Sequence, residues 1–329
     1  SRAFDKYVTM SSSALREMRR MAGYAVDSKW ELLGNQLNDG QLKMTKFQQE
    51  ASNHFKDFVD KNEKWLKQIH GPKAERIKIG EVNGKDVFIT PAMRISLYLN
   101  SLNQGNLRHI IGGTTINEGK LVTFEGGGLK VPDLDLYGKG LVKEAYANGE
   151  RVKMTEKGLK EILSKMTPKE KEYAKLVNEF LDGMCKKAIN ETSLKLNGYE
   201  KALVHNYFPI RTDGNFLDKD FESIVHDASI EGMGMLKKRT GGVNPIMLED
   251  VINVVERQIG GVSRYYGMAI PVRNFNMVYG TQEMGFNTSL KESIEKKWGP
   301  TATAFMENLL ADIQGSRANP SSFLDALRG

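Results

Sequence analysis

The chain has 329 residues, of which 40% are hydrophobic and 27% are charged, and its formal net charge is +6. This length suits one large domain or two ordinary ones, and the composition is that of a globular protein, which excludes a disordered chain. The charge excess is mild, so a surface of mixed, solvated charges is favoured over one built to bind nucleic acid.

Cysteine content and hydropathy also narrow the class of protein. Cys185 is the only cysteine, so no internal disulfide can form, and this favours synthesis in a reducing compartment. No apolar run approaches the roughly 20 residues that span a bilayer. The first residues show no signal-peptide pattern. We therefore expect a chain that acts inside a cell and does not enter a membrane.

The first 71 residues are expected to form an antiparallel helical hairpin. Apolar residues recur at helical spacing in two stretches, with Gly40 between them as the end of the first helix. Gly71-Pro72 ends the second helix. We take residues 1–71 as an N-terminal helical hairpin and residues 72–329 as a larger helical domain.

The clearest strand signal follows at about residues 76–90. Alternating apolar residues flank Asn83-Gly84, and such a pair between two alternating runs predicts a β-hairpin. Thr90-Pro91 then predicts the start of a helix. A glycine-rich stretch at about residues 112–140 predicts an irregular excursion, with a short strand at residues 121–124.

Helical patterns return in the second half of the chain. Thr155 and Thr167-Pro168 predict helix starts, and the Thr167 helix has the clearest apolar stripe and ends near Asn197-Gly198. A further helix begins near Asn244-Pro245, and Pro271 is expected to end or kink it. Shorter helices follow. The predicted fold class is mainly α, with several helices, one small β-hairpin and the glycine-rich excursion.

Motifs that carry chemistry are absent from the sequence. There is no phosphate-binding or dinucleotide-binding glycine pattern, and the five histidines are scattered. Cys185 lies on a helical stripe, where a lone cysteine is more often part of the core than a nucleophile. We therefore predict no catalytic residue, no metal site and no cofactor.

One segment, residues 205–213, concentrates polar and aromatic groups. A functional interpretation makes His205 a general base and Arg211 a clamp for an anion. The favoured structural interpretation places Tyr207 and Phe208 in the core, where they anchor the exit of the Thr167 helix against the helix that carries Tyr265 and Tyr266. The residues assigned to this structural motif are Asn206, Tyr207, Phe208, Pro209, Tyr266 and Pro271.

Two basic clusters are candidates for nucleic-acid contact. The first lies on one face of the first predicted helix, and no aromatic residues interleave with it as a stacking platform would require. A solvated face is therefore the favoured interpretation. The two clusters are Arg16, Arg19 and Arg20, and Lys237, Lys238 and Arg239.

Several phrases of the sequence resemble a known group of proteins. They are Asn206-Tyr207-Phe208-Pro209-Ile210, the runs at 232–237 and 244–251, and the run from Arg264 to Asn276. These resemble helical domains in the large "polyvalent" proteins of Firmicutes phages and integrative elements. The resemblance implies that the chain is a segment of a much longer protein, in the cytoplasm of a bacterial host or associated with a virion. It implies no catalytic residue.

The sequence does not assign a biochemical activity, and three hypotheses remain. The favoured one is a non-catalytic helical structural or interaction module, whose partners are other domains of its parent chain. The second is a nucleic-acid-binding module of a DNA-processing protein of a phage or mobile element. The third is an enzyme that uses the loop at residues 205–213. The oligomeric state stays open.

Overall fold

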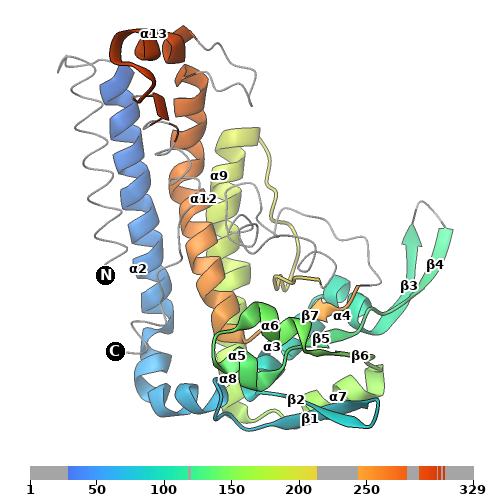
Figure 1. The fold of residues 1–329 in the computed structure, drawn as a ribbon. Helices are drawn as coiled ribbons and strands as arrows, with labels where there is room; N and C mark the ends of the chain where they lie inside the picture. Colours follow the sequence, from blue (N-terminus) through green and yellow to red (C-terminus); the bar gives the residue numbers. More distant parts are fainter. Residues whose placement is uncertain are drawn as a thin grey trace.

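The computed structural model describes residues 29–117, 120–212, 244–279 and 289–301, together with residues 303, 304 and 307. Helices make up most of this part of the chain, so the expected mainly α class is confirmed (Figure 1). The helices are α2 (Lys29–Ile69), α3 (Pro91–Leu102), α4 (Gln104–Ile111), α5 (Leu134–Gly138), α6 (Val142–Ala147), α7 (Glu156–Ser164), α8 (Pro168–Asn178), the π-helix η1 (Glu179–Cys185), α9 (Lys186–Asn197), α12 (Val251–Tyr279) and α13 (Ser289–Trp298).

The strands form three small sheets. One is the antiparallel pair β1–β2, another is the antiparallel pair β3–β4, and the third has the order β6-β5-β7, with β5 antiparallel to β6 and parallel to β7. Their bounds are β1 (Ile77–Val82), β2 (Lys85–Ile89), β3 (Gly112–Asn117), β4 (Lys120–Glu125), β5 (Leu129–Val131), β6 (Glu150–Val152) and β7 (Ile246–Met247).

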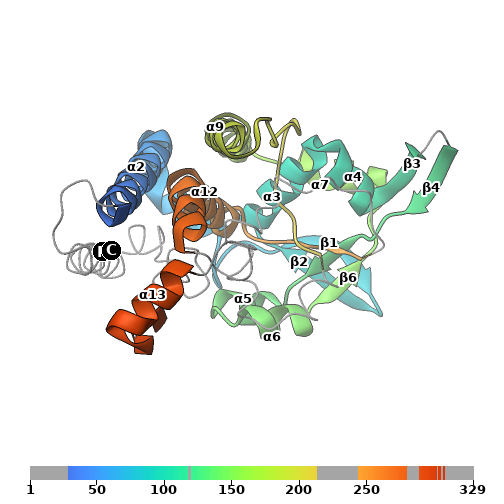
Figure 2. The same cartoon turned by 90° about the horizontal axis from the view of Figure 1, so that it is seen from above.

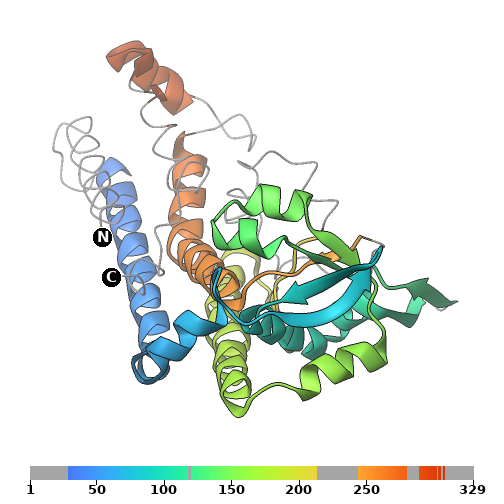
Figure 3. The same cartoon turned by 60° about the horizontal axis from the view of Figure 1, so that its bottom comes forward.

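The β1–β2 hairpin turns where the sequence predicts. Asn83 and Gly84 have φ angles of 51° and 76°, which is the left-handed geometry that an Asn-Gly turn requires. The hairpin lies between α5–α6 and α7 (Figure 3). Its register shifts between Lys78 and Gly80, which marks a β-bulge.

The glycine-rich stretch at residues 112–140 is more regular than the sequence analysis expects. It contains β3, β4, β5 and α5, and the short strand expected at residues 121–124 lies inside β4. The glycines allow backbones to approach closely. A Cβ added to Gly126 would lie closer than 3.0 Å to the carbonyl oxygen of Ile110, and one added to Gly128 would meet that of Val152.

The predicted turn at Gly40 is wrong. Helix α2 (Lys29–Ile69) passes through Gly40 without a break and kinks at Asn62, so residues 29–69 do not form two antiparallel helices that turn at Gly40. Residues 1–28 lie outside the described part of the chain. Gly40 has a packing role instead, because a Cβ added there would lie closer than 3.0 Å to the carbonyl oxygen of Gly267 in α12.

Pro271 does not end α12, which continues to Tyr279. A proline inside a helix removes one backbone hydrogen bond. Beyond it, however, the side chains of Val272, Phe275 and Tyr279 are all buried, and this burial offsets the loss. The expectation that Pro271 ends the helix is therefore wrong, and a kink at this residue stays a prediction.

Threonine caps begin α3, α7 and α8, as predicted. The side chains of Thr90, Thr155 and Thr167 each accept a bond from a backbone N–H in the first turn. Thr167 and Glu170 also form a capping box. Glu170 then accepts two further bonds from Arg94 of α3, at 3.0 and 2.8 Å, and both side chains are buried.

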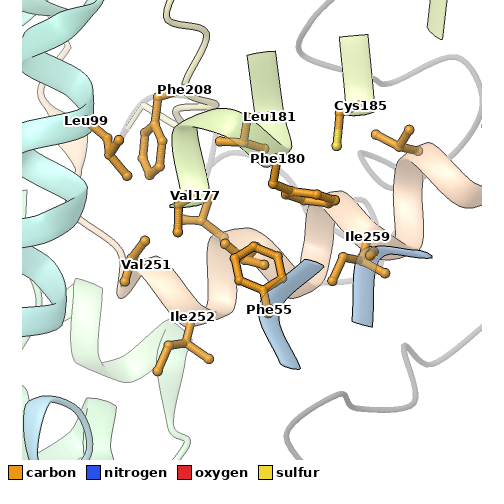
Figure 4. Close-up of a cluster of buried hydrophobic side chains, with 14 of the residues drawn as sticks. Phe55, Leu99, Val177, Phe180, Leu181, Cys185, Phe208, Val251, Ile252 and Ile259 are labelled. Atoms are coloured by element: carbon orange, nitrogen blue, oxygen red, sulfur yellow. The ribbon is translucent and has the colours of Figure 1, made fainter. Parts of the chain in front are cut away.

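The main core lies between α2, α12 and the continuous helix formed by α8, η1 and α9, which run side by side (Figures 1 and 2). Phe55 and Phe180 meet edge to face near Ile259, with ring centroids 5.3 Å apart (Figure 4). Cys185 is fully buried here, and burial raises the pKa of its thiol well above its usual range. Its core role is therefore the one that the packing supports.

Replacing Gly267 by alanine should destabilise the fold, because the new methyl group would collide with the backbone of α2. The expected loss is about 1–3 kcal/mol in the free energy of unfolding, measured by denaturant titration. Gly260 is a matched control in the same helix, since a Cβ there meets no atom within 4 Å. Gly260→Ala should stabilise the protein by up to about 1 kcal/mol. Equal effects of the two changes would contradict the close contact.

Candidate functional site

The segment at residues 199–212 turns back along the helix that precedes it. Gly198, with a φ of 79°, ends α9 in the left-handed conformation that the sequence predicts. Asn190 then holds the returning chain, because its Oδ1 accepts from the backbone N–H of Ala202 at 2.7 Å and its Nδ2 donates to the Ala202 carbonyl at 3.1 Å. Lys186 donates to the carbonyl of Val204 at 3.2 Å.

Asparagines at the junction of α3 and α4 hold the other side of this segment. Asn103 donates from Nδ2 to the carbonyl of His205 at 3.3 Å, and Asn106 donates from Nδ2 to that of Phe208 at 2.8 Å. Both asparagine side chains are buried. Carbonyls of the segment are thus satisfied by side chains rather than by a strand or helix.

Asn206 occupies a backbone conformation that few residues other than glycine adopt. Its φ is 50°, and asparagine is one of the residue types that tolerate this region. Its side chain bridges two helices, since Nδ2 donates to the carbonyl of Leu102 and Oδ1 accepts from Asn178, both at 3.4 Å. Asn206 therefore joins α3 to α8.

The predicted burial of Tyr207 and Phe208 is confirmed, but their position along the helix differs. Phe208 lies beside Leu99 and Val177, and therefore next to α8 (Figure 4). The sequence predicts that these rings pack at the end of α9. In the structure, the chain has already run back past that end when it reaches Phe208. Pro209 is also buried.

Tyr266 lies in a different contact. Its hydroxyl donates to Oε2 of Glu191 at 3.3 Å, and its ring is 6.1 Å from that of Phe47. The expected packing of Tyr266 against Tyr207 and Phe208 is therefore replaced by contacts with α9 and α2. Tyr265 belongs to the main core that also contains Tyr207 and Phe208.

A cluster of buried charges lies where the segment meets the sheet. The backbone N–H of Met247 donates to the carbonyl of Arg211 at 2.9 Å, which brings the Arg211 side chain beside Glu249. Glu249 accepts two bonds from Arg257 of α12, at 2.6 and 2.8 Å, and lies 3.7 Å from Arg211. Burial raises the pKa of Glu249, but the two guanidinium groups outweigh it and hold this pKa below its usual range.

Asp250 has a different role, because it caps α12. Its Oδ1 accepts from the backbone N–H of Ile252 at 2.8 Å. Burial raises the pKa of its carboxyl to about 7, and the neighbouring charge of Glu249 adds to this effect.

Two tyrosine hydroxyls, from α5 and α6, also contact the residues before α12. The Tyr137 hydroxyl accepts from the Asp250 N–H at 3.2 Å, and that of Tyr146 donates to the Leu248 carbonyl at 2.8 Å.

The contacts of this segment and of the charged cluster bind parts of the chain to one another. A surface hollow lies beside α7, and a space with no room for a water molecule lies between Lys186, Ala202, Val204 and Tyr207. Neither is lined by His205 or Arg211. His205 is exposed. Among the described residues, no group of three or more histidine, cysteine, aspartate or glutamate side chains could hold a metal ion.

The structure places only part of the predicted site. Asn206, Tyr207, Phe208 and Arg211 come together at the segment that retraces the helix. Asp213 and both basic clusters lie outside the described residues, so their proposed contacts stay predictions. Those clusters are Arg16, Arg19 and Arg20, and Lys237, Lys238 and Arg239.

Sequence reasoning missed Glu249, the ion-pair partner of Arg211, and its neighbour Asp250. Glu249 and Asp250 follow the apolar run 246–248 and precede the α12 helix. Two adjacent carboxylates at the junction of a buried strand and a helix are a signal for a helix cap. Nothing local could reveal Arg257 as the second partner of Glu249, because the three side chains meet only in the folded chain.

Comparisons with protein-family models, curated proteins and solved structures found no match to this chain. Among the described residues, no helix is both long enough and apolar enough to cross a membrane.

Asp250→Asn should stabilise the protein at alkaline pH and remove part of its pH dependence. The pKa of Asp250 is about 7 in the folded state, against about 3.9 in an unfolded chain. The folded state therefore binds more protons between these values, and its stability falls as pH rises through this range. Above pH 7 the buried Asp250 carboxyl is ionised, and the full cost of this ionisation lowers the stability of the fold. Asp250→Asn removes this cost and should raise the free energy of unfolding by on the order of 4 kcal/mol at most.

The measurement is the free energy of unfolding of both proteins from pH 4 to pH 8. Asparagine caps a helix as well as aspartate does, so the capping bond is kept. Asp57→Asn, which removes an exposed carboxylate from α2, controls for the change in net charge. A stability difference that does not vary with pH would contradict the raised pKa.

Proposed function

We propose that this chain is a non-catalytic structural and interaction module of a larger protein. The observation that carries the proposal is the way the segment at residues 199–212 is used. The side chains of Tyr207 and Phe208 fill the core, and polar groups of the segment bond to α3, α4, α9 and the residues before α12. The segment that would serve a reaction thus holds four parts of the fold together.

The electrostatics of the buried cluster support the same function. Glu249 is shared by Arg211 and Arg257, and all three side chains are less than one-fifth exposed. Arg211 already lies within ion-pair distance of Glu249 of its own chain, whereas an anion clamp needs a guanidinium that faces a cavity. The enzyme hypothesis therefore gains no support from Arg211 or from the exposed His205.

The resemblance to polyvalent proteins of phages and integrative elements supports a context for this module. It rests on the phrases around Asn206-Tyr207-Phe208-Pro209 and Arg264 to Asn276. In this proposal, the partners are other domains of the parent chain, and the parent acts in a bacterial cell or travels with a virion. Recovery of the flanking sequence would test this context directly.

Phe208→Ala should destabilise the protein strongly, because it removes a buried ring from the contact between α3 and α8. The expected loss is about 3–5 kcal/mol, measured by thermal or denaturant unfolding. His205→Ala is the matched control, since it changes an exposed side chain of the same segment and should alter stability by less than about 0.5 kcal/mol. An unchanged melting temperature for Phe208→Ala would contradict the structural role.

A titration with labelled duplex DNA tests the nucleic-acid alternative. A protein that neutralises several phosphates loses affinity steeply as salt rises. For a net charge of +6 distributed over a mixed surface, we expect only weak binding that is insensitive to alanine replacement of Arg16, Arg19 and Arg20. Tight, strongly salt-dependent binding that this triple replacement abolishes would overturn the proposed function in favour of nucleic-acid binding.

A further inference from the structure

The β3–β4 hairpin extends away from the rest of the described chain as an arm (Figures 1 and 2). Its two strands pair over six residues each, without a bulge. Leu121 is 76% exposed, and the hydroxyls of Thr114 and Thr123 bond to each other at 3.0 Å on an exposed face. The arm therefore places an apolar residue and a regular pair of strands in solvent.

The root of the arm is fixed to the body. The backbone N–H groups of Gly127 and Gly128 donate to the carbonyls of His109 and Ile110 at 2.8 and 3.1 Å. A Cβ added to Gly126 would collide with the last turn of α4. The glycines thus allow both strands to leave the body at one tightly packed point, which gives the arm a defined direction.

The outer edge of β3 lacks the features that normally prevent strands from pairing between molecules. Its sequence, Gly-Gly-Thr-Thr-Ile-Asn, has no charge and no proline. Among the residues that the structure describes, β3 pairs with β4 alone. The β1–β2 hairpin of the same chain provides the contrast, because it carries a bulge and four charged residues, namely Lys78, Glu81, Lys85 and Asp86.

We propose that β3 pairs edge to edge, in antiparallel fashion, with β3 of a second copy of this chain. A twofold axis makes any strand edge complementary to itself, because each donor then faces the matching acceptor. The uncharged edge brings no like charges together. A two-stranded hairpin is marginal in water, whereas three or more strands form an independently stable sheet, and two arms together supply four.

The size of the contact sets its strength. Stable protein interfaces bury roughly 1,200–2,000 Å², and a pair of six-residue strands offers less than that. The dimer is therefore reversible and depends on protein concentration. This inference rests on the proposed function as an interaction module and names a second copy of the chain as one partner. Its evidence comes from the β3–β4 arm and not from the segment that contains Phe208.

The test is the molar mass of the whole chain, measured by sedimentation velocity over a wide range of concentration. The wild type should pass from the monomer of 36.9 kDa toward twice that mass as concentration rises. The double change Thr114→Lys with Thr115→Lys adds two positive charges to the pairing edge of each copy. It should weaken association by about tenfold or more, because like charges on paired strands repel.

The matched control is Val122→Lys with Thr123→Lys. These residues lie opposite Thr115 and Thr114 in the register, so the same charge is added one strand away from the contact. This control should dimerise more tightly than the Thr114 and Thr115 variant. Mixing that variant with its counterpart, in which both threonines become glutamate, should restore association between the two, which also shows that each is folded.

Three outcomes would overturn the proposal. They are a wild type that stays monomeric at every concentration, a control variant that loses association equally, and folded lysine and glutamate variants that do not associate when mixed. A monomeric wild type would point to an extended strand of another protein as the occupant of this edge. It would leave the proposed function standing, because that function is judged by the Phe208 and DNA measurements.

Discussion

One buried ion pair fixes how the helical part of the chain meets its β-containing part. Arg94 lies in α3, whose side chains belong to two cores, with Leu97 in the core of the sheets and Leu99 in that of the long helices. Its guanidinium donates two bonds to Glu170, and neither side chain is more than 8% exposed. A buried charge that loses its partner is strongly destabilising. Helix α3 therefore packs on α8 in the position that joins these two groups.

The same carboxylate links this contact to the start of α8. Glu170 also accepts from the backbone N–H of Thr167, so the capping box and the ion pair share one side chain. The relative position of α3 and α8 in turn creates the path of the returning segment, since Asn206 bonds to both helices and Phe208 lies between them. The segment is thus ordered by a contact made elsewhere, and asparagines of α9 and of the α3–α4 junction satisfy its backbone groups.

The features predicted correctly from the sequence are those set by a few neighbouring residues. The Asn83-Gly84 turn and the caps at Thr90 and Thr167 depend on bonds within three or four positions, so residue type and spacing reveal them. The turn predicted at Gly40 is wrong because the role of this glycine depends on Gly267, which lies far away in the sequence. Glycine has a low helix propensity in isolation. Here tertiary packing outweighs that propensity, because only a glycine lets the two helices approach so closely.

Glu249 and Asp250 show the same limit at the candidate site. They are adjacent in sequence, yet the pKa of Glu249 is lowered and that of Asp250 is raised to about 7. The difference arises because Arg211 and Arg257 both face Glu249, while Asp250 caps α12 beside Tyr137. In an enzyme, two carboxyl groups with diverging pKa values can serve as acid and base. Here both carboxyl groups bond to their own chain, so the divergence follows from packing a loop, a strand and a small helix against the start of α12.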